Sequence, residues 1–133
     1  MRGAGAFRNG EPIRVSSESD LGRSLLATGF AYDPRGREEN LVHFAAFMNR
    51  TRGLRRDGSA ALDLSYVACG RLDGFWELHL HPWDVAAGFL LVEEAGGRVS
   101  DLAGNPPSRS GKETVASNGR IHDRMVAVLQ GRA

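Results

Sequence analysis

The change of hydrophobic period at Pro82 constrains the fold more than any other feature of the sequence. From 73 to 81 the residues alternate as in a strand, with Trp76, Leu78 and Leu80 on one face and Phe75, Glu77, His79 and His81 on the other. We expect the apolar face to lie in the core. Pro82 has the backbone angle favoured at the first position of a helix, and a helix is expected over 83–95 before Gly96 and Gly97 end it. A strand followed directly by a helix is the repeating unit of α/β folds.

The remaining elements also alternate between strand and helix patterns. In the helix expected over 38–49, four apolar residues fall at i, i+3, i+4 and i+7, which predicts that they cover a sheet: Leu41, Phe44, Ala45 and Met48. A hairpin is expected over 5–15, short strands over 24–30, 54–57, 98–102 and 113–117, a buried helix from the N-cap Ser59 to Gly70, and a last helix over 120–130. The sequence therefore predicts one α/β domain over 1–133, a layered sheet covered by helices.

Charge and composition exclude several classes of function. Seventeen basic and 16 acidic residues give a net charge of +1, so no strong field attracts nucleic acid or anionic lipid. We therefore expect neither a nucleic-acid partner nor a membrane partner. No apolar run approaches the length of a membrane span or resembles a signal peptide, which favours the cytoplasm. The single cysteine, Cys69, follows an apolar segment and is predicted to be a core residue.

Two carboxylates flank the expected connection from strand to helix. Glu77 lies near the end of the strand, and Asp84 lies in the first turn of the following helix. Ligands commonly bind at such connections in α/β proteins. A carboxylate at a helix N-terminus is also stabilised by free amides and the helix dipole, by about 0.3–1 kcal/mol. Local pattern alone therefore explains Asp84 equally well as a metal ligand or as a helix-end charge.

The same strand suggests a second kind of metal site. Glu77, His79 and His81 share one face of the expected strand, and imidazoles two residues apart can chelate zinc or nickel. Histidines at a strand end are more often surface residues or supports for neighbouring groups. Whether His79 and His81 bind any metal stays open at this point.

Several segments resemble the inositol monophosphatase family in order and spacing. The run from Pro82 to Gly88, followed by 92–97, is similar to the second signature of that family. Further matching segments are Gly5-Ala6-Phe7 with Asn9-Gly10, and the runs 55–61, 70–74 and 116–118. The resemblance covers almost the whole chain. It implies the C-terminal half of the sugar-phosphatase fold.

The resemblance also implies a chemistry and a set of site residues. Family members hydrolyse phosphomonoesters with magnesium ions that hold the phosphate and activate a water. By this resemblance Asp84 is a Mg²⁺ ligand, and Glu77 accepts hydrogen bonds from sugar hydroxyls. The backbone of Gly58, Ser59 and Ala60 contacts the substrate, while Ser59 also caps its helix. Glu77 and Ala60 favour a polyol such as inositol. Fructose bisphosphate, adenosine bisphosphates, NADP and histidinol phosphate are the alternative substrate classes.

The other metal ligands of the family belong to segments that these 133 residues do not contain. A Glu-Glu pair and a loop of the type Asp-Pro-Ile-Asp-Gly-Thr are expected in an N-terminal half, whereas Asp33-Pro34 shares only the first two residues of that loop. We therefore expect a truncated or split protein, inactive without an N-terminal-half polypeptide. Uncovered apolar surface, including the Phe7 hairpin, predicts a homodimer or other self-association. The alternative is a non-catalytic assembly or binding module.

Overall fold

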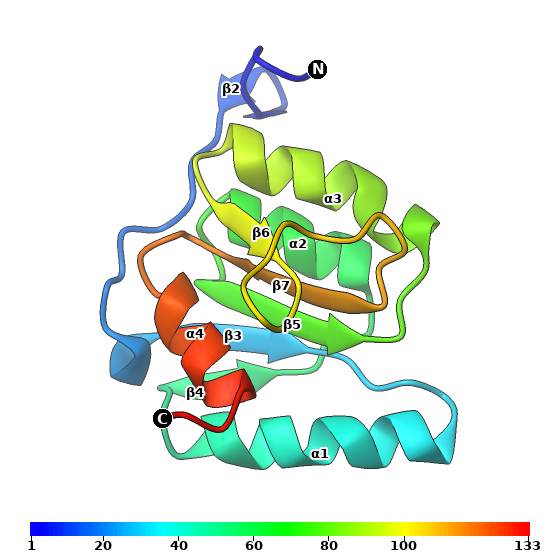
Figure 1. Ribbon diagram of the computed structural model, residues 1–133. Coiled ribbons are helices and arrows are strands. Elements are labelled where there is room, and N and C mark those ends of the chain that lie inside the picture. Colours follow the sequence, from blue (N-terminus) through cyan, green and yellow to red (C-terminus); the bar gives the residue numbers. More distant parts are fainter.

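The computed structural model describes all 133 residues and contains a five-stranded mixed sheet with helices on both faces (Figure 1). The strand order is β4-β3-β5-β7-β6. β3 pairs in parallel with β4 and β5, whereas β7 pairs antiparallel with β5 and β6. The strands are β3 (Leu25–Thr28), β4 (Gly53–Arg55), β5 (Gly74–Leu78), β6 (Arg98–Ser100) and β7 (Glu113–Ser117). The prediction of an α/β fold is confirmed.

Two helices cover each face of the sheet. Helices α2 (Ala60–Ala68) and α3 (Pro82–Glu94) pack together on one face, and α1 (Pro34–Met48) and α4 (His122–Leu129) cover the other. The expected hairpin is present as β1 (Phe7–Arg8) and β2 (Glu11–Pro12), and a short 3₁₀ helix, η1 (Leu21–Arg23), precedes β3. No helix is both long and apolar enough to cross a membrane.

The central strand β5 contributes to two separate cores. Phe75 packs with Leu64 and Val92 of the α2–α3 layer, while Trp76 packs with Phe47 of α1 and Met125 of α4. Successive residues of a strand point to opposite faces, and both faces of β5 are covered by helices. The expectation of a single core face was therefore wrong. The strand also ends at Leu78, earlier than predicted.

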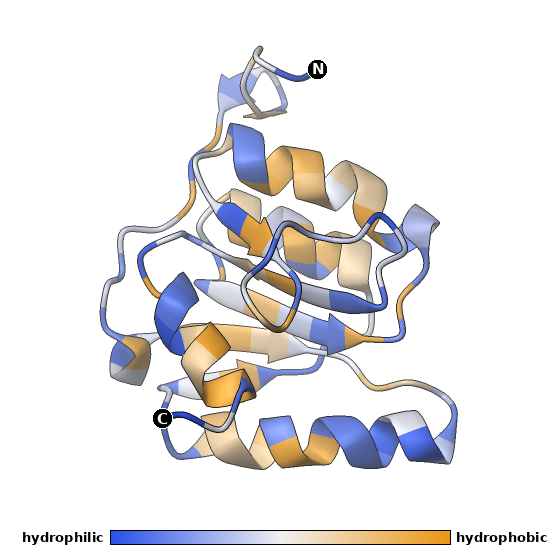
Figure 2. Cartoon of the chain, viewed as in Figure 1, coloured by the Kyte–Doolittle hydropathy of each residue, from blue (hydrophilic) through white to orange (hydrophobic).

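The predicted core face of α1 was wrong as well. Leu41 is 54% exposed and Met48 is 48% exposed, and Ala45 also faces solvent. The buried residues are Gly36, Asn40 and Phe47, with Phe44 packed beside them. The N-terminal part of α1 is largely hydrophilic (Figure 2). The buried side of α1 includes the polar Asn40, so the spacing of apolar residues did not reveal which side faces the sheet.

Asn40 is buried because three hydrogen bonds satisfy its amide. Its Nδ2 donates to Thr28 Oγ1 at 3.0 Å and to the Gly29 carbonyl at 2.8 Å, and its Oδ1 accepts from Trp76 Nε1 at 2.7 Å. A buried amide with its partners in place carries little penalty. This network joins α1 to β3 and β5 just below the end of the sheet where the pocket lies.

Helix α2 also departs from the expected pattern. Ser59 caps it, because its Oγ accepts the Leu62 N–H at 3.2 Å, as predicted. The helix is not apolar all round, since Leu62 is exposed and the acidic Asp63 is buried. Cys69 follows the helix and is only half-buried, so its assignment as a core residue was wrong.

Candidate functional site

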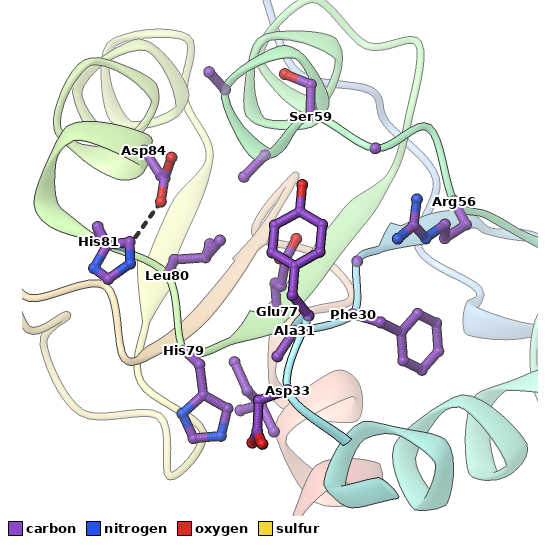
Figure 3. A pocket seen from close by; sticks show the side chains of 16 residues that line it. Phe30, Ala31, Asp33, Arg56, Ser59, Glu77, His79, Leu80, His81 and Asp84 are labelled. Atoms are coloured by element: carbon purple, nitrogen blue, oxygen red, sulfur yellow. Dashed lines mark hydrogen bonds between the residues drawn. The ribbon is translucent and has the colours of Figure 1, made fainter. Parts of the chain in front are cut away.

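A pocket of about 560 Å³ lies at the carboxyl ends of β3 and β5. Because these two strands are parallel and adjacent, the loops that follow them meet at the same edge of the sheet. The walls come from the segments 29–33, 56–61 and 77–84, which belong to three different connections (Figure 3). This is the location at which α/β folds most often bind ligands.

Three helices begin at this pocket. Asp33 caps α1 by accepting the Gly36 N–H at 3.0 Å, and Ser59 caps α2. In α3, Asp84 Oδ2 accepts the His81 N–H at 2.8 Å. Asp33, Ser59 and Asp84 all line the pocket. Helix N-termini carry unpaired amide donors, so this edge of the fold suits ligands with oxygen acceptors.

Glu77 lies in the pocket, and the pKa of its carboxyl group is raised. Burial, and to a smaller extent the nearby Asp84 carboxylate, raises the pKa of Glu77 to about 7, while Arg56 opposes the shift. The carboxyl packs against Gly29, where any Cβ would collide with it. Gly29 therefore makes room for the Glu77 carboxyl in the wall of the pocket.

The structure brings together all five site residues singled out from the sequence. Gly58, Ser59, Ala60, Glu77 and Asp84 line the one pocket, although they come from two segments far apart in the chain. Gly58 has a φ of 91°, a left-handed conformation that favours glycine. The turn it makes directs the chain into the N-terminus of α2.

The two histidines of the zinc alternative do not lie on one strand face with Glu77. His79 has a φ of 63°, which ends the alternation after β5. Its Nε2 contacts Glu39 Oε2 at 2.7 Å, whereas the His81 ring stacks on Trp83 with ring centres 4.7 Å apart. No group of three or more His, Cys, Asp or Glu side chains is placed to hold a metal ion. The shared strand face on which the zinc alternative rested was therefore wrong.

Sequence reasoning missed Asp63, a buried acid behind the pocket. The residue is 1% exposed, and neither carboxyl oxygen has a hydrogen-bond partner. Burial, together with the carboxyl groups of Asp57 and Glu77, raises the pKa of Asp63 to about 8. A raised pKa of this size favours the neutral acid at pH 7. An acidic residue within the otherwise apolar α2 was the signal that could have revealed it.

Replacing Asp63 with Asn is expected to flatten the dependence of stability on pH. The folded pKa of Asp63 is raised above the ordinary value of 3.8, so its favourable contribution is fully present below about pH 4 and falls as pH rises toward 8. Asn has the same shape and no charge, so Asp63→Asn should be more stable than the parent by about 1–3 kcal/mol at pH 8. Urea unfolding at pH 5 and pH 8 measures this. The exposed Glu38→Gln is the control, and an unchanged slope in Asp63→Asn would contradict the prediction.

Comparison with known proteins extends this description. A sequence profile of the inositol monophosphatase family matches residues 1–132. The chain is 48% identical to the inositol-1-monophosphatase of Synechocystis over 126 residues, which cover 94% of this chain and 44% of that protein. It is 46% identical to the Nus factor SuhB of Escherichia coli over 130 residues, which cover 97% of this chain and 49% of that protein. The chain thus spans about half the length of these relatives.

Solved structures agree with the sequence relatives. The inositol monophosphatase of Anabaena superposes with a TM-score of 0.93 at 49% identity, over 97% of this chain and 54% of the other. The Thermotoga maritima IMPase superposes with a TM-score of 0.85 at 42% identity, over 98% of this chain and 49% of the other. The resemblance noted in the sequence is confirmed, and the chain belongs to the inositol monophosphatase family.

Proposed function

We propose that this chain is the C-terminal, substrate-side half of a magnesium-dependent phosphatase that hydrolyses inositol 1-phosphate or a similar polyol phosphate. The observation that carries the proposal is the convergence of Glu77, Asp84 and the N-terminus of α2 on one pocket. Family membership and relatives named inositol-1-monophosphatase support a phosphatase. The magnesium dependence and the choice of substrate are our proposals.

The donor atoms of the pocket fit Mg²⁺ in kind, and one carboxylate is too few for a complete site. Mg²⁺ prefers hard oxygen ligands, and Asp84 has one carboxyl oxygen that accepts the His81 N–H and a second that remains available. A bound Mg²⁺ would supply Lewis-acid chemistry at the phosphate. Because no second acidic ligand set is placed around Asp84, we propose that the remaining ligands come from another segment.

The other pocket residues would bind and orient the substrate. We propose that the Glu77 carboxylate accepts hydrogen bonds from hydroxyl groups of the polyol. The free amides at the start of α2, around Gly58, Ser59 and Ala60, would donate to substrate oxygens. Fructose bisphosphate, nucleotide bisphosphates and histidinol phosphate are alternative substrates, and direct comparison of their turnover separates them.

Reassembly with the N-terminal half of a relative is expected to produce activity, whereas we propose that the chain alone is inactive. The 133-residue chain should release no phosphate from inositol 1-phosphate with Mg²⁺, because the rest of the ligand set is supplied elsewhere. Addition of the N-terminal half of the Synechocystis relative should generate Mg²⁺-dependent release, measured colorimetrically. Activity of the pure chain would contradict the proposed inactivity, and an inactive but co-purifying mixture would contradict the proposed function.

Sedimentation of the same samples tests the proposed self-association. Phe7, Val42 and Met48 are exposed apolar residues on the hairpin and α1. We propose that the chain alone forms a homodimer or larger species through such surfaces, and that it forms a heterodimer with the added half. A single monomeric species at tens of micromolar would contradict the proposal.

A non-catalytic binding module is the second candidate function. Several close relatives are named Nus factor SuhB, including those of Escherichia coli and Pseudomonas aeruginosa. The expected absence of a nucleic-acid partner therefore stays a prediction, as does the cytoplasmic location. Under this alternative the reassembled protein would fold and show no phosphate release with any of the substrate classes named above.

A further inference from the structure

His79 occupies a backbone conformation that ordinarily calls for glycine. The residues other than glycine with positive φ are Asn9, in the tight turn of the hairpin, and His79, in the wall of the pocket. His79 is held by its neighbours, because its N–H donates to the Lys112 carbonyl at 2.8 Å and the Leu80 N–H donates to the Gly111 carbonyl at 3.2 Å. A side chain at such a position adds strain that glycine avoids. The retention of strain in a pocket wall points to a role in the site.

The imidazole of His79 is oriented by α1. Its Nε2 lies 2.7 Å from Glu39 Oε2, and because a carboxylate only accepts hydrogen bonds, Nε2 carries the hydrogen. The two side chains are 48% and 54% exposed, so this pair contributes little to stability. A contribution to folding stability therefore does not explain why position 79 carries an imidazole. The pair does fix the tautomer of the ring, in the manner of carboxylate–histidine pairs in other sites.

The second ring nitrogen of His79 is the group left for a ligand. Nδ1 makes no hydrogen bond within the chain, and His79 is among the residues that line the pocket, with its ring on the Asp33 side (Figure 3). When the ring is neutral and its hydrogen is on Nε2, Nδ1 is a hydrogen-bond acceptor. A hydroxyl group can donate to this acceptor, whereas a fully ionised phosphate has no hydrogen to donate. The part of the pocket wall formed by His79 therefore favours ligands that carry hydroxyl groups next to the phosphate.

We propose that His79 is a specificity-determining residue that accepts a hydrogen bond from a hydroxyl group of a polyol phosphate, with Glu39 as its positioning residue. The proposal rests on the proposed function and deepens it. It distinguishes polyol phosphates from simple phosphate monoesters. A glycine at position 79 would bind the phosphate equally well and would lose this discrimination.

The test compares two ligands in the presence of MgCl₂, by NMR titration of the 133-residue chain reassembled with the N-terminal half of the Synechocystis relative. Inositol 1-phosphate carries a phosphate and several hydroxyl groups, whereas ethyl phosphate carries a phosphate and no hydroxyl group. His79→Gly should weaken inositol 1-phosphate binding about 3- to 10-fold and leave ethyl phosphate binding within about 2-fold. His79→Asn, which tolerates the left-handed conformation and keeps a polar group, should recover part of the loss. Glu39→Gln should give an intermediate loss and the neighbouring Glu38→Gln none.

The outcomes separate this inference from the proposed function. His79→Gly relieves backbone strain, so its thermal midpoint should not fall below that of the parent, and weakened binding cannot then be assigned to unfolding. Equal losses for both ligands, or no loss for either, overturn the role of His79 alone. Failure of the reassembled parent protein to bind either ligand or to release phosphate overturns the proposed function, on which the role of His79 rests.

Discussion

Replacing Asp84 with Asn is expected to lower Mg²⁺-dependent phosphate release by the reassembled enzyme about 100-fold or more. The amide keeps an oxygen that can accept the His81 N–H, so the start of α3 should remain in place. What is lost is the negative charge that we propose to hold Mg²⁺. The loss of the charge at the helix N-terminus should cost only about 0.3–1 kcal/mol in stability. Phosphate release and urea unfolding of the same samples measure the two effects.

Asp33→Asn is the matched control for this experiment. Asp33 also caps a helix at the pocket, because its Oδ2 accepts the Gly36 N–H, and we assign it no metal-binding role. The variant should lose a comparable amount of stability and keep phosphate release within about 3-fold of the parent. Equal loss of activity in Asp33→Asn and Asp84→Asn would show that helix capping, and not metal binding, explains the effect.

Replacing Trp76 with Ala is expected to cost about 3–5 kcal/mol of unfolding free energy. The side chain is fully buried, and its ring lies 4.4 Å from that of Phe47 between centroids. Removal also leaves Asn40 Oδ1 without the Trp76 Nε1–H that it accepts at 2.7 Å. Domains of this size are stable by roughly 5–15 kcal/mol, so the variant should be close to unfolded. Urea unfolding monitored by circular dichroism measures the loss.

Trp83→Ala provides the comparison at a surface position. Trp83 is mostly exposed in the first turn of α3, where its ring stacks on His81. Its removal should change the unfolding free energy by about 1 kcal/mol or less. If Trp76→Ala were no more destabilising than Trp83→Ala, the assignment of Trp76 to the core between the sheet, α1 and α4 would be wrong.

Periodicity predicted the α/β class and missed features that depend on tertiary contacts. The alternation over 73–81 located β5 but extended it past Leu78, and it could not reveal that helices cover both faces of that strand. The face of α1 was misassigned because Asn40 is polar, and its burial depends on partners in β3 and β5 that no local pattern displays. Burial of a polar side chain is decided by its partners, which lie far away in sequence.

The sequence predicted those site residues that lie at the end of a strand or at the start of a helix. Glu77, Asp84 and Ser59 come together because parallel strands deliver their loops to one edge of the sheet. Asp63 and His79 were not predictable in their roles. The burial of Asp63 arises from the packing of α2, and the left-handed conformation of His79 is imposed by contacts with the loop at 111–112.

The meeting of three helix starts also sets the charge balance of the pocket. Each N-terminus carries the equivalent of about half a positive charge, so α1, α2 and α3 together contribute roughly +1.5. Asp33, Glu77 and Asp84 supply up to three negative charges at the same place, and Arg56 adds a positive one, so the two signs come close to balance. A bare phosphate dianion would therefore meet almost no net attraction, whereas a divalent cation and a phosphate dianion enter together as a neutral pair. This balance favours capture of the phosphate only after, or together with, its cation.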